Sequence, residues 1–329
     1  MYTDIPFALA LVFVLGGLAL LTWGANRFVD GSSAAAKALG VSPFVIGMVI
    51  IGFGTSAPEL AVSALSGFMG HGNLSLGNAY GSNIFNIAIV LGVAALIRPI
   101  RVRPAIVAFA VPLLVGVSLL SCLLVCAGGA FSRLDGVLAL GAFAVLLPVY
   151  CWFDRRSQPA GGGAPEAAPA ADVRHPWATL VLGLAVLVGA SHLLVWGAVD
   201  LARALGVSEL LIGLTVVAAG TSLPELASAV VSARKGQHDF VLGNVIGSNF
   251  FNTLAVVGVS GAISPFRDVS PAILTRDLGV MVALSLSLGL FGFNLSKPRE
   301  DGRIGRGKAA LWILSFLAYL LVTIAQERA

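Results

Sequence analysis

Two glutamates lie in stretches of sequence that are otherwise apolar. Glu59 and Glu225 each follow a proline directly, Pro58 in the first stretch and Pro224 in the second. A carboxylate at the centre of a membrane helix costs roughly 2.5–3.5 kcal/mol on insertion scales, so a residue of this kind is a candidate for function. Proline removes a backbone donor and frees carbonyl oxygens of the preceding turn. Each motif therefore predicts a helix kink that presents carboxylate and carbonyl oxygens together.

Hydroxyl and amide side chains accompany both glutamates. The glutamate motifs read GTSAPE at 54–59 and GTSLPE at 220–225, and two partner motifs read GSNIFN at 81–86 and GSNFFN at 247–252. In each partner motif, the serine and the last asparagine are four residues apart and share one helix face. Hard cations such as Ca2+ require oxygen ligands, and two ionised glutamates neutralise one Ca2+. The predicted site, with main-chain oxygens at the threonines, comprises Glu59, Glu225, Thr55, Thr221, Ser56, Ser222, Ser82, Ser248, Asn86 and Asn252.

Small polar residues also have a structural explanation in membranes, because serine, asparagine and glycine join packed helices. That alternative stays open for the four outer asparagines, but helix packing does not require a duplicated carboxylate. The four asparagines are Asn78, Asn83, Asn244 and Asn249. Four glycines are expected to let the partner helices approach closely: Gly77, Gly81, Gly243 and Gly247.

All of these motifs occur twice at one fixed distance. The glutamate motif moves from 54 to 220, the partner motif from 81 to 247 and the segment ALGVS from 38 to 204, a constant displacement of 166 residues. A common displacement over three segments indicates an internal repeat. The chain is therefore expected to consist of two related halves.

The composition indicates the elements that must position these motifs. Of 329 residues, 57% are hydrophobic and 11% are charged, which excludes an ordinary soluble domain with about a quarter charged residues. Roughly 20 apolar residues are needed for one membrane-spanning helix. Ten runs approach this length: 6–25, 43–66, 74–97, 105–126, 134–153, 177–197, 209–233, 240–263, 278–296 and 309–326.

Five runs fall in each half, and an odd number makes the second half enter the membrane from the opposite side. We therefore predict an all-α polytopic membrane protein, with ten transmembrane helices in two inverted-topology five-helix repeats. The predicted halves are residues 1–156 and 174–329. Residues 157–173 read SQPAGGGAPEAAPAADV, which predicts a flexible cytoplasmic linker too short for a regulatory domain.

The distribution of basic residues predicts how the chain is oriented in the membrane. With the N-terminus outside, the loops after runs 1, 3, 5, 7 and 9 hold 15 of the 20 Lys and Arg, and the other side holds five. Cytoplasmic loops carry such an excess, so both termini are expected outside a cell (inner) membrane. Dispersed basic residues do not favour nucleic acid as a partner. The lipid bilayer is the expected surrounding, and the oligomeric state stays open, a monomer included.

Other chemistries have weaker support. No histidine lies in either motif and no HExxH occurs, so Ser56 and Ser222 lack a general base and an intramembrane hydrolase is not favoured. Imidazole and thiolate ligands of transition metals are missing from the same motifs. The three cysteines fall inside predicted spans, where a disulfide framework is not expected: Cys122, Cys126 and Cys151. We therefore expect neither an enzyme nor a cofactor.

At GTSAPE, GTSLPE, GSNIFN and GSNFFN, the sequence resembles the sodium/calcium exchanger branch of the calcium/cation antiporter family, in its bacterial or archaeal form without regulatory domains. The resemblance implies electrogenic exchange of about three Na+ for one Ca2+ by alternating access. It also implies Ca2+ ligation by Glu59, Glu225 and the main-chain oxygens of Thr55 and Thr221. The serines expected to help hold Na+ are Ser56, Ser82, Ser222 and Ser248.

Two alternatives for the transport mode follow from the same motifs. Proton-driven relatives resemble one another in a GNxxE pattern, whereas this chain ends the partner motifs with Asn86 and Asn252, which favours Na+ over H+ as the driving ion. Several members of the resembled family have Asp where Asn252 stands, so stoichiometry can differ here. A passive cation channel could also use a glutamate pair, but repeated inverted halves are typical of transporters.

Overall fold

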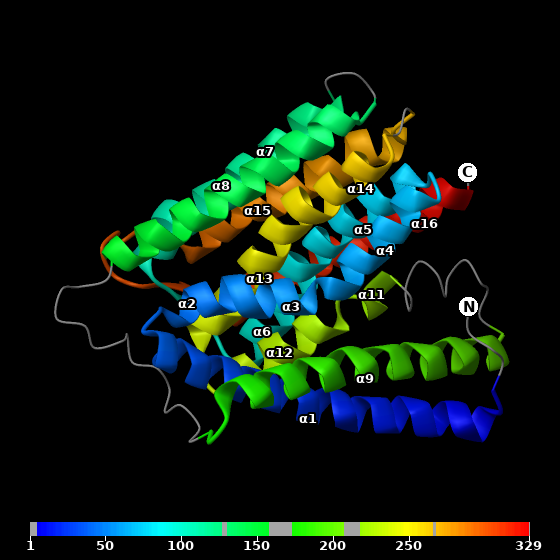
Figure 1. Cartoon of the computed structure of the whole chain (residues 1–329), viewed down its shortest axis with the longest axis horizontal. Coiled ribbons are helices and arrows are strands. Elements are labelled where there is room, and N and C mark those ends of the chain that lie inside the picture. Colours follow the sequence, from blue (N-terminus) through cyan, green and yellow to red (C-terminus); the bar gives the residue numbers. More distant parts are fainter. Residues whose placement is uncertain (1–4, 127–129, 158–172, 207–217, 266–267, 329) are drawn as a thin grey trace.

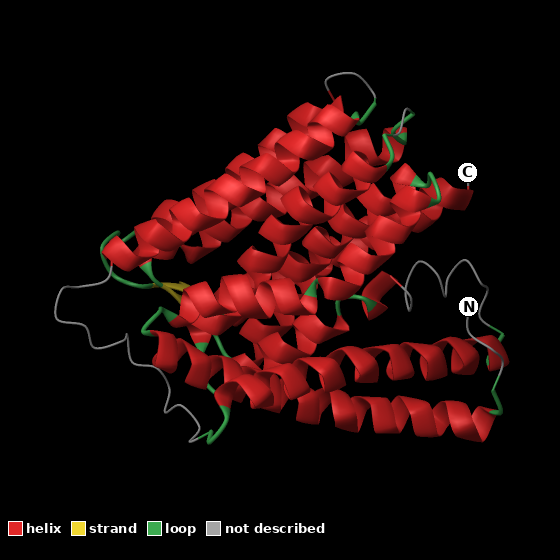
Figure 2. Ribbon diagram, viewed as in Figure 1, coloured by secondary structure: helices red, strands yellow, loops and turns green. Residues whose placement is uncertain are grey.

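The computed structural model describes residues 5–126, 130–157, 173–206, 218–265 and 268–328, and nearly all of them are helical (Figure 2). Two short strands are the exception in this part of the chain: β1 (Ile100–Val102) pairs antiparallel with β2 (Gly302–Ile304). The helices of the first half, with π-helical segments marked η, are α1 (Phe7–Leu39), α2 (Pro43–Ile46), η1 (Gly47–Ile51), α3 (Gly52–Thr55), α4 (Ala57–Phe68), α5 (Gly72–Phe85), η2 (Asn86–Leu91), α6 (Gly92–Ile97), η3 (Ile106–Ala110), α7 (Val111–Cys126) and α8 (Arg133–Ser157).

In the described residues of the second half, the helices from α11 to α14 follow the same order as those from α3 to α6. The predicted linker 157–173 lies almost entirely outside the described residues, and so does the beginning of the predicted run 209–233. The helices of the second half are α9 (Pro176–Ala204), α11 (Ala218–Gly220), α12 (Leu223–Arg234), α13 (His238–Phe251), η5 (Asn252–Val256), α14 (Val257–Ile263), η6 (Ile273–Asp277), α15 (Leu278–Gly292) and α16 (Arg306–Arg328).

Most of the predicted runs coincide with helices. Among the described residues, eight helical segments are long and apolar enough to cross a membrane, and the bent pair Pro43–Thr55 and Ala57–Phe68 makes a ninth if it is counted as one span. The protein is therefore a helical, multi-pass membrane protein. The run 209–233 is described only from residue 218 onward, so the tenth span stays a prediction.

Helix α1 is longer than the apolar run that predicted it. The apolar run ended before Arg27, yet α1 continues to Leu39. A charged residue interrupts the apolar run without interrupting the helix. Gly40 ends it instead: its φ of 62° is left-handed, and its N–H points back to the last turn. The added length lets Asp30 accept a hydrogen bond from Lys235 at 2.7 Å.

Helices α1 and α9, one from each half, lie side by side and antiparallel (Figure 1). A side chain at any of three glycines on α1 would come within 3.0 Å of the α9 backbone. Gly183 and Gly197 bring α9 equally close to α1. The facing pairs are Gly17 with Leu194, Gly24 with Leu187 and Gly31 with Leu180. Successive pairs are therefore seven residues apart along each helix.

The centre of the fold is the continuous helix formed by α13, η5 and α14. Its most apolar eighteen-residue stretch is 100% buried, against 22% for α1, so this helix is covered by protein rather than by lipid. Glycines let α2 and η1 cross it closely: a Cβ on Gly243 would lie 2.5 Å from the Phe44 carbonyl oxygen. The expected close approach is thus found at Gly243 and Gly247, whereas Gly77 and Gly81 have no described atom nearby.

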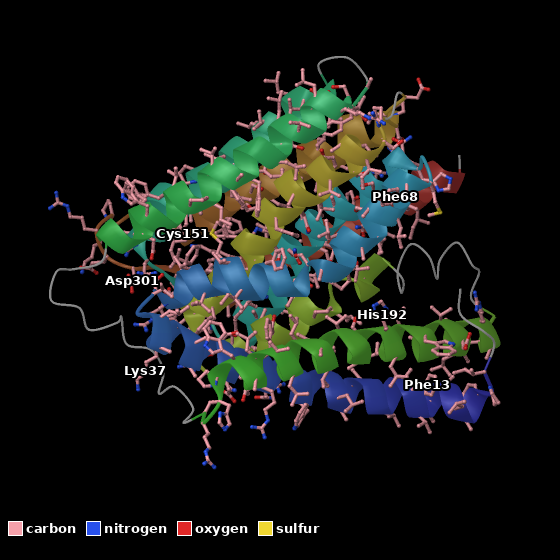
Figure 3. All side chains as sticks on the ribbon, in the orientation of Figure 1. Phe13, Lys37, Phe68, Cys151, His192 and Asp301 are labelled. Atoms are coloured by element: carbon pink, nitrogen blue, oxygen red, sulfur yellow. The ribbon has the colours of Figure 1, made fainter. Side chains whose placement is uncertain are left out.

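Loops that follow the odd-numbered runs meet at one end of the molecule, which we call the sheet side. There β1 pairs with β2, Arg103 contacts Asp239 at 3.0 Å, and Ser42 donates a hydrogen bond to Asp154 at 2.7 Å. Figure 3 places Lys37 and Asp301 at this end.

The loops that follow the second and eighth runs meet at the opposite end, the far side. Asn73 donates to the Asp268 carbonyl oxygen at 3.0 Å and accepts from the Ser270 N–H at 2.9 Å. Phe68, at the end of α4, is labelled at this end in Figure 3. Connections therefore alternate between the two ends along the chain.

Candidate cation site

Both glutamate motifs interrupt their helices at the serine. The first helix bends by 47° between α3 and α4, and Ser56 at the break has ψ of 7°. In the second half α11 ends at Gly220 and α12 begins at Leu223, and Ser222 has ψ of 9°. Pro58 and Pro224 occupy the first turn after each break, where a missing N–H does least harm. The predicted kink is thus confirmed in the first half, and the second half has the same local geometry.

One carbonyl oxygen at the second break accepts a hydrogen bond from another helix. Because Pro224 cannot donate to the Gly220 carbonyl oxygen, that oxygen accepts a hydrogen bond from Ser191 on α9 at 2.8 Å. Helical bonding resumes at the serines, with Leu226 N–H reaching the Ser222 oxygen at 3.1 Å. The main-chain oxygens of Thr55 and Thr221 precede this point and lie directly at the breaks.

The two halves exchange hydrogen bonds between serine and glutamate. Ser56 donates to Glu225 Oε1 at 3.0 Å, and Ser222 donates to Glu59 Oε1 at 3.0 Å. All four side chains are completely buried. Each serine of one motif therefore positions the carboxylate of the other.

The partner helices supply a second serine to each carboxylate. Ser82 donates to Glu59 Oε1 at 3.4 Å and Ser248 donates to Glu225 Oε1 at 3.5 Å. One oxygen of each carboxylate, Oε2, is buried and has no hydrogen-bond partner. A buried charged oxygen without a partner is strongly unfavourable. The two Oε2 atoms thus fit a cation that both halves would contact.

Two asparagines extend the same polar centre. Asn86 and Asn252 begin the π-helical segments η2 and η5, a local geometry that is common at functional sites. Asn86 donates to Asn249 Oδ1 at 3.0 Å, but its own Oδ1 is buried and unpaired. Both polar atoms of Asn252 are buried and unpaired. These neutral oxygens add to the set that could contact a hard cation.

The two threonines differ in their side chains. Thr55 Oγ1 donates to the Ile51 carbonyl oxygen at 2.9 Å and lies 3.3 Å from Asn244 Oδ1. Thr221 Oγ1 is buried without a partner. The structure thus brings Ser82 and Ser248 to the glutamates at the two breaks, while Asn86 and Asn252 follow one helical turn after these serines. Among the predicted residues, the second half holds more unpaired oxygen atoms than the first.

Two asparagines whose role the sequence left open hold the glutamate backbones. Asn78 donates to the Glu59 carbonyl oxygen at 3.1 Å, and Asn244 donates to the Glu225 carbonyl oxygen at 3.1 Å. The same amide groups reach the hydroxyls of Ser63 and Ser228 at 3.0 Å. Asn78 and Asn244 are separated by the same displacement as the other repeated residues, and this was the sequence signal for them. It could not reveal that they bind the glutamate backbones.

Replacing Asn244 by alanine is expected to weaken Ca2+ transport without removing it. The change removes one of the two side-chain donors to the Glu225 carbonyl oxygen, which keeps its hydrogen bond from Ser228, and leaves the Ser228 hydroxyl without a donor. A lost buried hydrogen bond costs about 1–3 kcal/mol. We expect a rise of about tenfold in the Ca2+ concentration for half-maximal uptake. Asn26→Ala is the matched control, since Asn26 donates only to Thr22 of its own helix. An unchanged Ca2+ dependence in Asn244→Ala would remove this positioning role.

Metal binding through a larger cluster of ionisable ligands is not indicated. In the described ranges, no group of three or more His, Cys, Asp or Glu side chains could hold a metal ion. A cation at the breaks would therefore have to be held by two carboxylates together with hydroxyl, amide and main-chain oxygens.

Comparison with known proteins decides the family. A family model described as "Sodium/calcium exchanger protein" matches residues 9–152 and 175–325. The chain belongs to the sodium/calcium exchanger family. Members of this family are transporters, so the buried glutamates lie in the core of a membrane antiporter.

Relatives in the exchanger family match almost end to end. The "Putative antiporter CaxA" of Alkalimonas amylolytica is 42% identical over 94% of this chain and 97% of its own length. The "Sodium/calcium exchanger MaX1" of Methanosarcina acetivorans is 31% identical over 94% of this chain and 97% of its own. A solved structure of the sodium-calcium exchanger NCX_Mj, soaked with zero Na+ and Ca2+, is 33% identical and superposes with a TM-score of 0.79 over 98% of this chain and 99% of that one.

Proposed function

We propose that this protein exchanges Ca2+ for Na+ across the membrane by alternating access. The observation that carries the proposal is the pair of buried, unpaired Oε2 atoms of Glu59 and Glu225, one from each half. Two carboxylates balance the charge of one Ca2+, so the loaded centre can cross a low-dielectric region with little net charge. The family and the name of the relative MaX1 support the same pair of ions.

The two ions would bind to overlapping sets of oxygens around the carboxylates. Ca2+ would bind between the Glu59 and Glu225 carboxylates, with the main-chain oxygens of Thr55 and Thr221. Na+ would use the four serines around the carboxylates, together with the amide oxygens: Ser56, Ser82, Ser222, Ser248, Asn86 and Asn252. Because both ions draw on the same carboxylate oxygens, their binding is mutually exclusive and the exchange is coupled.

Ten spans in two inverted five-helix repeats, residues 1–156 and 174–329, would carry this site. The alternation of loops between the sheet side and the far side supports the arrangement, since each crossing must change side. The excess of basic residues in the loops of the sheet side supports a cytoplasmic position for that side. Both termini would then lie outside the cell membrane.

The exchange would be electrogenic. With two carboxylates and no third acid at Asn252, three Na+ would carry one more positive charge through the centre than one Ca2+. Movement of a net charge makes transport sensitive to the membrane potential, by about 2.3 kcal/mol per charge for each 100 mV.

Uptake of 45Ca2+ into proteoliposomes tests the proposal. Vesicles loaded with Na+ are expected to accumulate Ca2+, whereas vesicles loaded with K+, or given only a pH gradient, are not. Varying the membrane potential with K+ and valinomycin then gives the net charge moved per Ca2+.

Two outcomes would replace the proposal. Uptake driven by the pH gradient alone would identify a proton-coupled exchanger and would contradict the argument from Asn86 and Asn252, which cannot ionise. Ca2+ flux that continues without any opposing cation would identify a passive channel.

A further inference from the structure

The small sheet places two arginines opposite each other. In the β1–β2 pair, Arg101 is the direct partner of Arg303, between the pairs Ile100–Ile304 and Val102–Gly302. The flanking positions are buried, while both arginines are exposed. Like charges directly opposite in an antiparallel pair destabilise the pair. A negative charge from outside the pair would relieve this repulsion.

A third arginine joins them from the preceding turn. The guanidinium group of Arg98 lies against Gly236, whose φ of 73° closes the turn between α12 and α13. A side chain at Gly236 would come within 2.8 Å of Arg98 Nη1. His238, at the start of α13, lies within electrostatic range of Arg98, Arg101 and Arg303. Two loops thus bring positive charge to one place on the sheet side, against the turn of a third loop.

Neighbouring cations of the same side have partners in the protein. Arg103 pairs with Asp239 at 3.0 Å, Arg306 donates to the Leu96 carbonyl oxygen at 3.0 Å, and Lys308 donates to the Phe291 carbonyl oxygen at 2.7 Å. By contrast, no carboxylate of the described residues forms an ion pair with the three arginines of the cluster. The three arginines therefore have no direct ion-pair partner among the described residues.

The cluster lies where a membrane span ends. Arg98 directly follows α6, whose last residues Leu96 and Ile97 are exposed apolar side chains. Phe293, which follows α15 next to the sheet, is exposed as well. Apolar side chains beside arginines match the boundary between acyl chains and headgroups, and basic pockets at this level bind anionic headgroups.

We propose that Arg98, Arg101 and Arg303 form a binding site for the phosphate of an anionic phospholipid headgroup. Guanidinium groups offer paired donors that match phosphate oxygens. One phosphate in contact with both strands would bridge Arg101 and Arg303 and offset their repulsion. The lipid would thereby hold together the loops after the third, seventh and ninth predicted spans.

Binding of phosphatidylglycerol to the detergent-purified full chain, counted by native mass spectrometry, tests the site. Each arginine near anionic lipid contributes about a fivefold gain in affinity, so Arg101→Gln/Arg303→Gln should weaken binding by about twentyfold or more. Lys37→Gln/Arg174→Gln removes two exposed charges that do not belong to the β1–β2 pair and should bind like the wild type. Arg101→Lys/Arg303→Lys keeps the charge and should retain most of the binding.

A second readout separates a lipid site from a merely structural role. Without anionic lipid, Arg101→Gln/Arg303→Gln should unfold at the wild-type temperature or above, because a repulsive pair is gone. Phosphatidylglycerol should raise the unfolding temperature of the wild type and not that of this variant. Equal binding of phosphatidylcholine and phosphatidylglycerol would overturn the proposal. Displacement of the lipid by an equal concentration of inorganic phosphate would overturn the lipid assignment in favour of a soluble anion.

Discussion

Glu225→Gln is expected to abolish Na+-dependent Ca2+ uptake, and Glu59→Gln is expected to do the same. In each variant an amide replaces a carboxylate whose Oε1 is held by two serines and whose Oε2 is free for a cation. The change removes one of the two charges that balance Ca2+. Loss of one partner of a buried charged contact costs about 2–5 kcal/mol, so uptake at limiting Ca2+ should fall by about a hundredfold or more.

Proteoliposome uptake with matched protein amounts measures this effect. The control is Glu300→Gln, since Glu300 is an exposed glutamate that pairs with Lys297 on the surface. That variant should transport as the wild type does. Sustained Ca2+ uptake by either buried-glutamate variant, at normal abundance in the membrane, would show that the site is elsewhere.

Gly247→Ala is expected to lower the stability of the protein strongly. A Cβ at this position would lie 2.6 Å from the Cα of Met48, and backbone cannot move aside as a flexible side chain can. Overpacking of a core typically costs about 1–3 kcal/mol, and here two helix backbones must separate. Thermal unfolding of the purified protein in detergent measures the loss.

An exposed helical glycine provides the control for this change. Gly141 lies on the exposed face of α8, and a Cβ there would meet no described atom within 4 Å. Gly141→Ala should therefore unfold at the wild-type temperature or above. Because alanine is the better helix former, helix propensity alone would not lower the stability of either variant. An equal loss of stability in both variants would therefore show that the crossing of η1 and α13 is not the cause.

Local features of the site could be predicted because each depends on a few neighbouring residues. The prolines at 58 and 224 indicate interrupted helices, and spacing of four residues predicts that Ser82 and Asn86 share a face. The break at Ser56 and the hydrogen bond from Ser82 to Glu59 agree with these expectations.

Contacts between the halves could not be predicted in the same way. The hydrogen bonds from Ser56 to Glu225 and from Ser222 to Glu59 join residues that are far apart in the sequence, and a repeat alone does not reveal which copies touch. The pairing of β1 with β2 was also unforeseen, since three residues are too few for a strand pattern. Likewise, the apolar pattern used to predict the first span stops before Arg27, so it could not show that α1 continues to Leu39.

The close packing of α1 on α9 also constrains the order of events during biosynthesis. A chain emerging from the ribosome inserts α1 first, but the backbone that fits its glycines belongs to a helix that begins at residue 176. Until then the glycine surface of α1 faces lipid, which cannot match it as closely as another helix does. The first half consequently cannot complete its helix packing alone in the membrane. The fold becomes complete only when the second half of the chain has been synthesised.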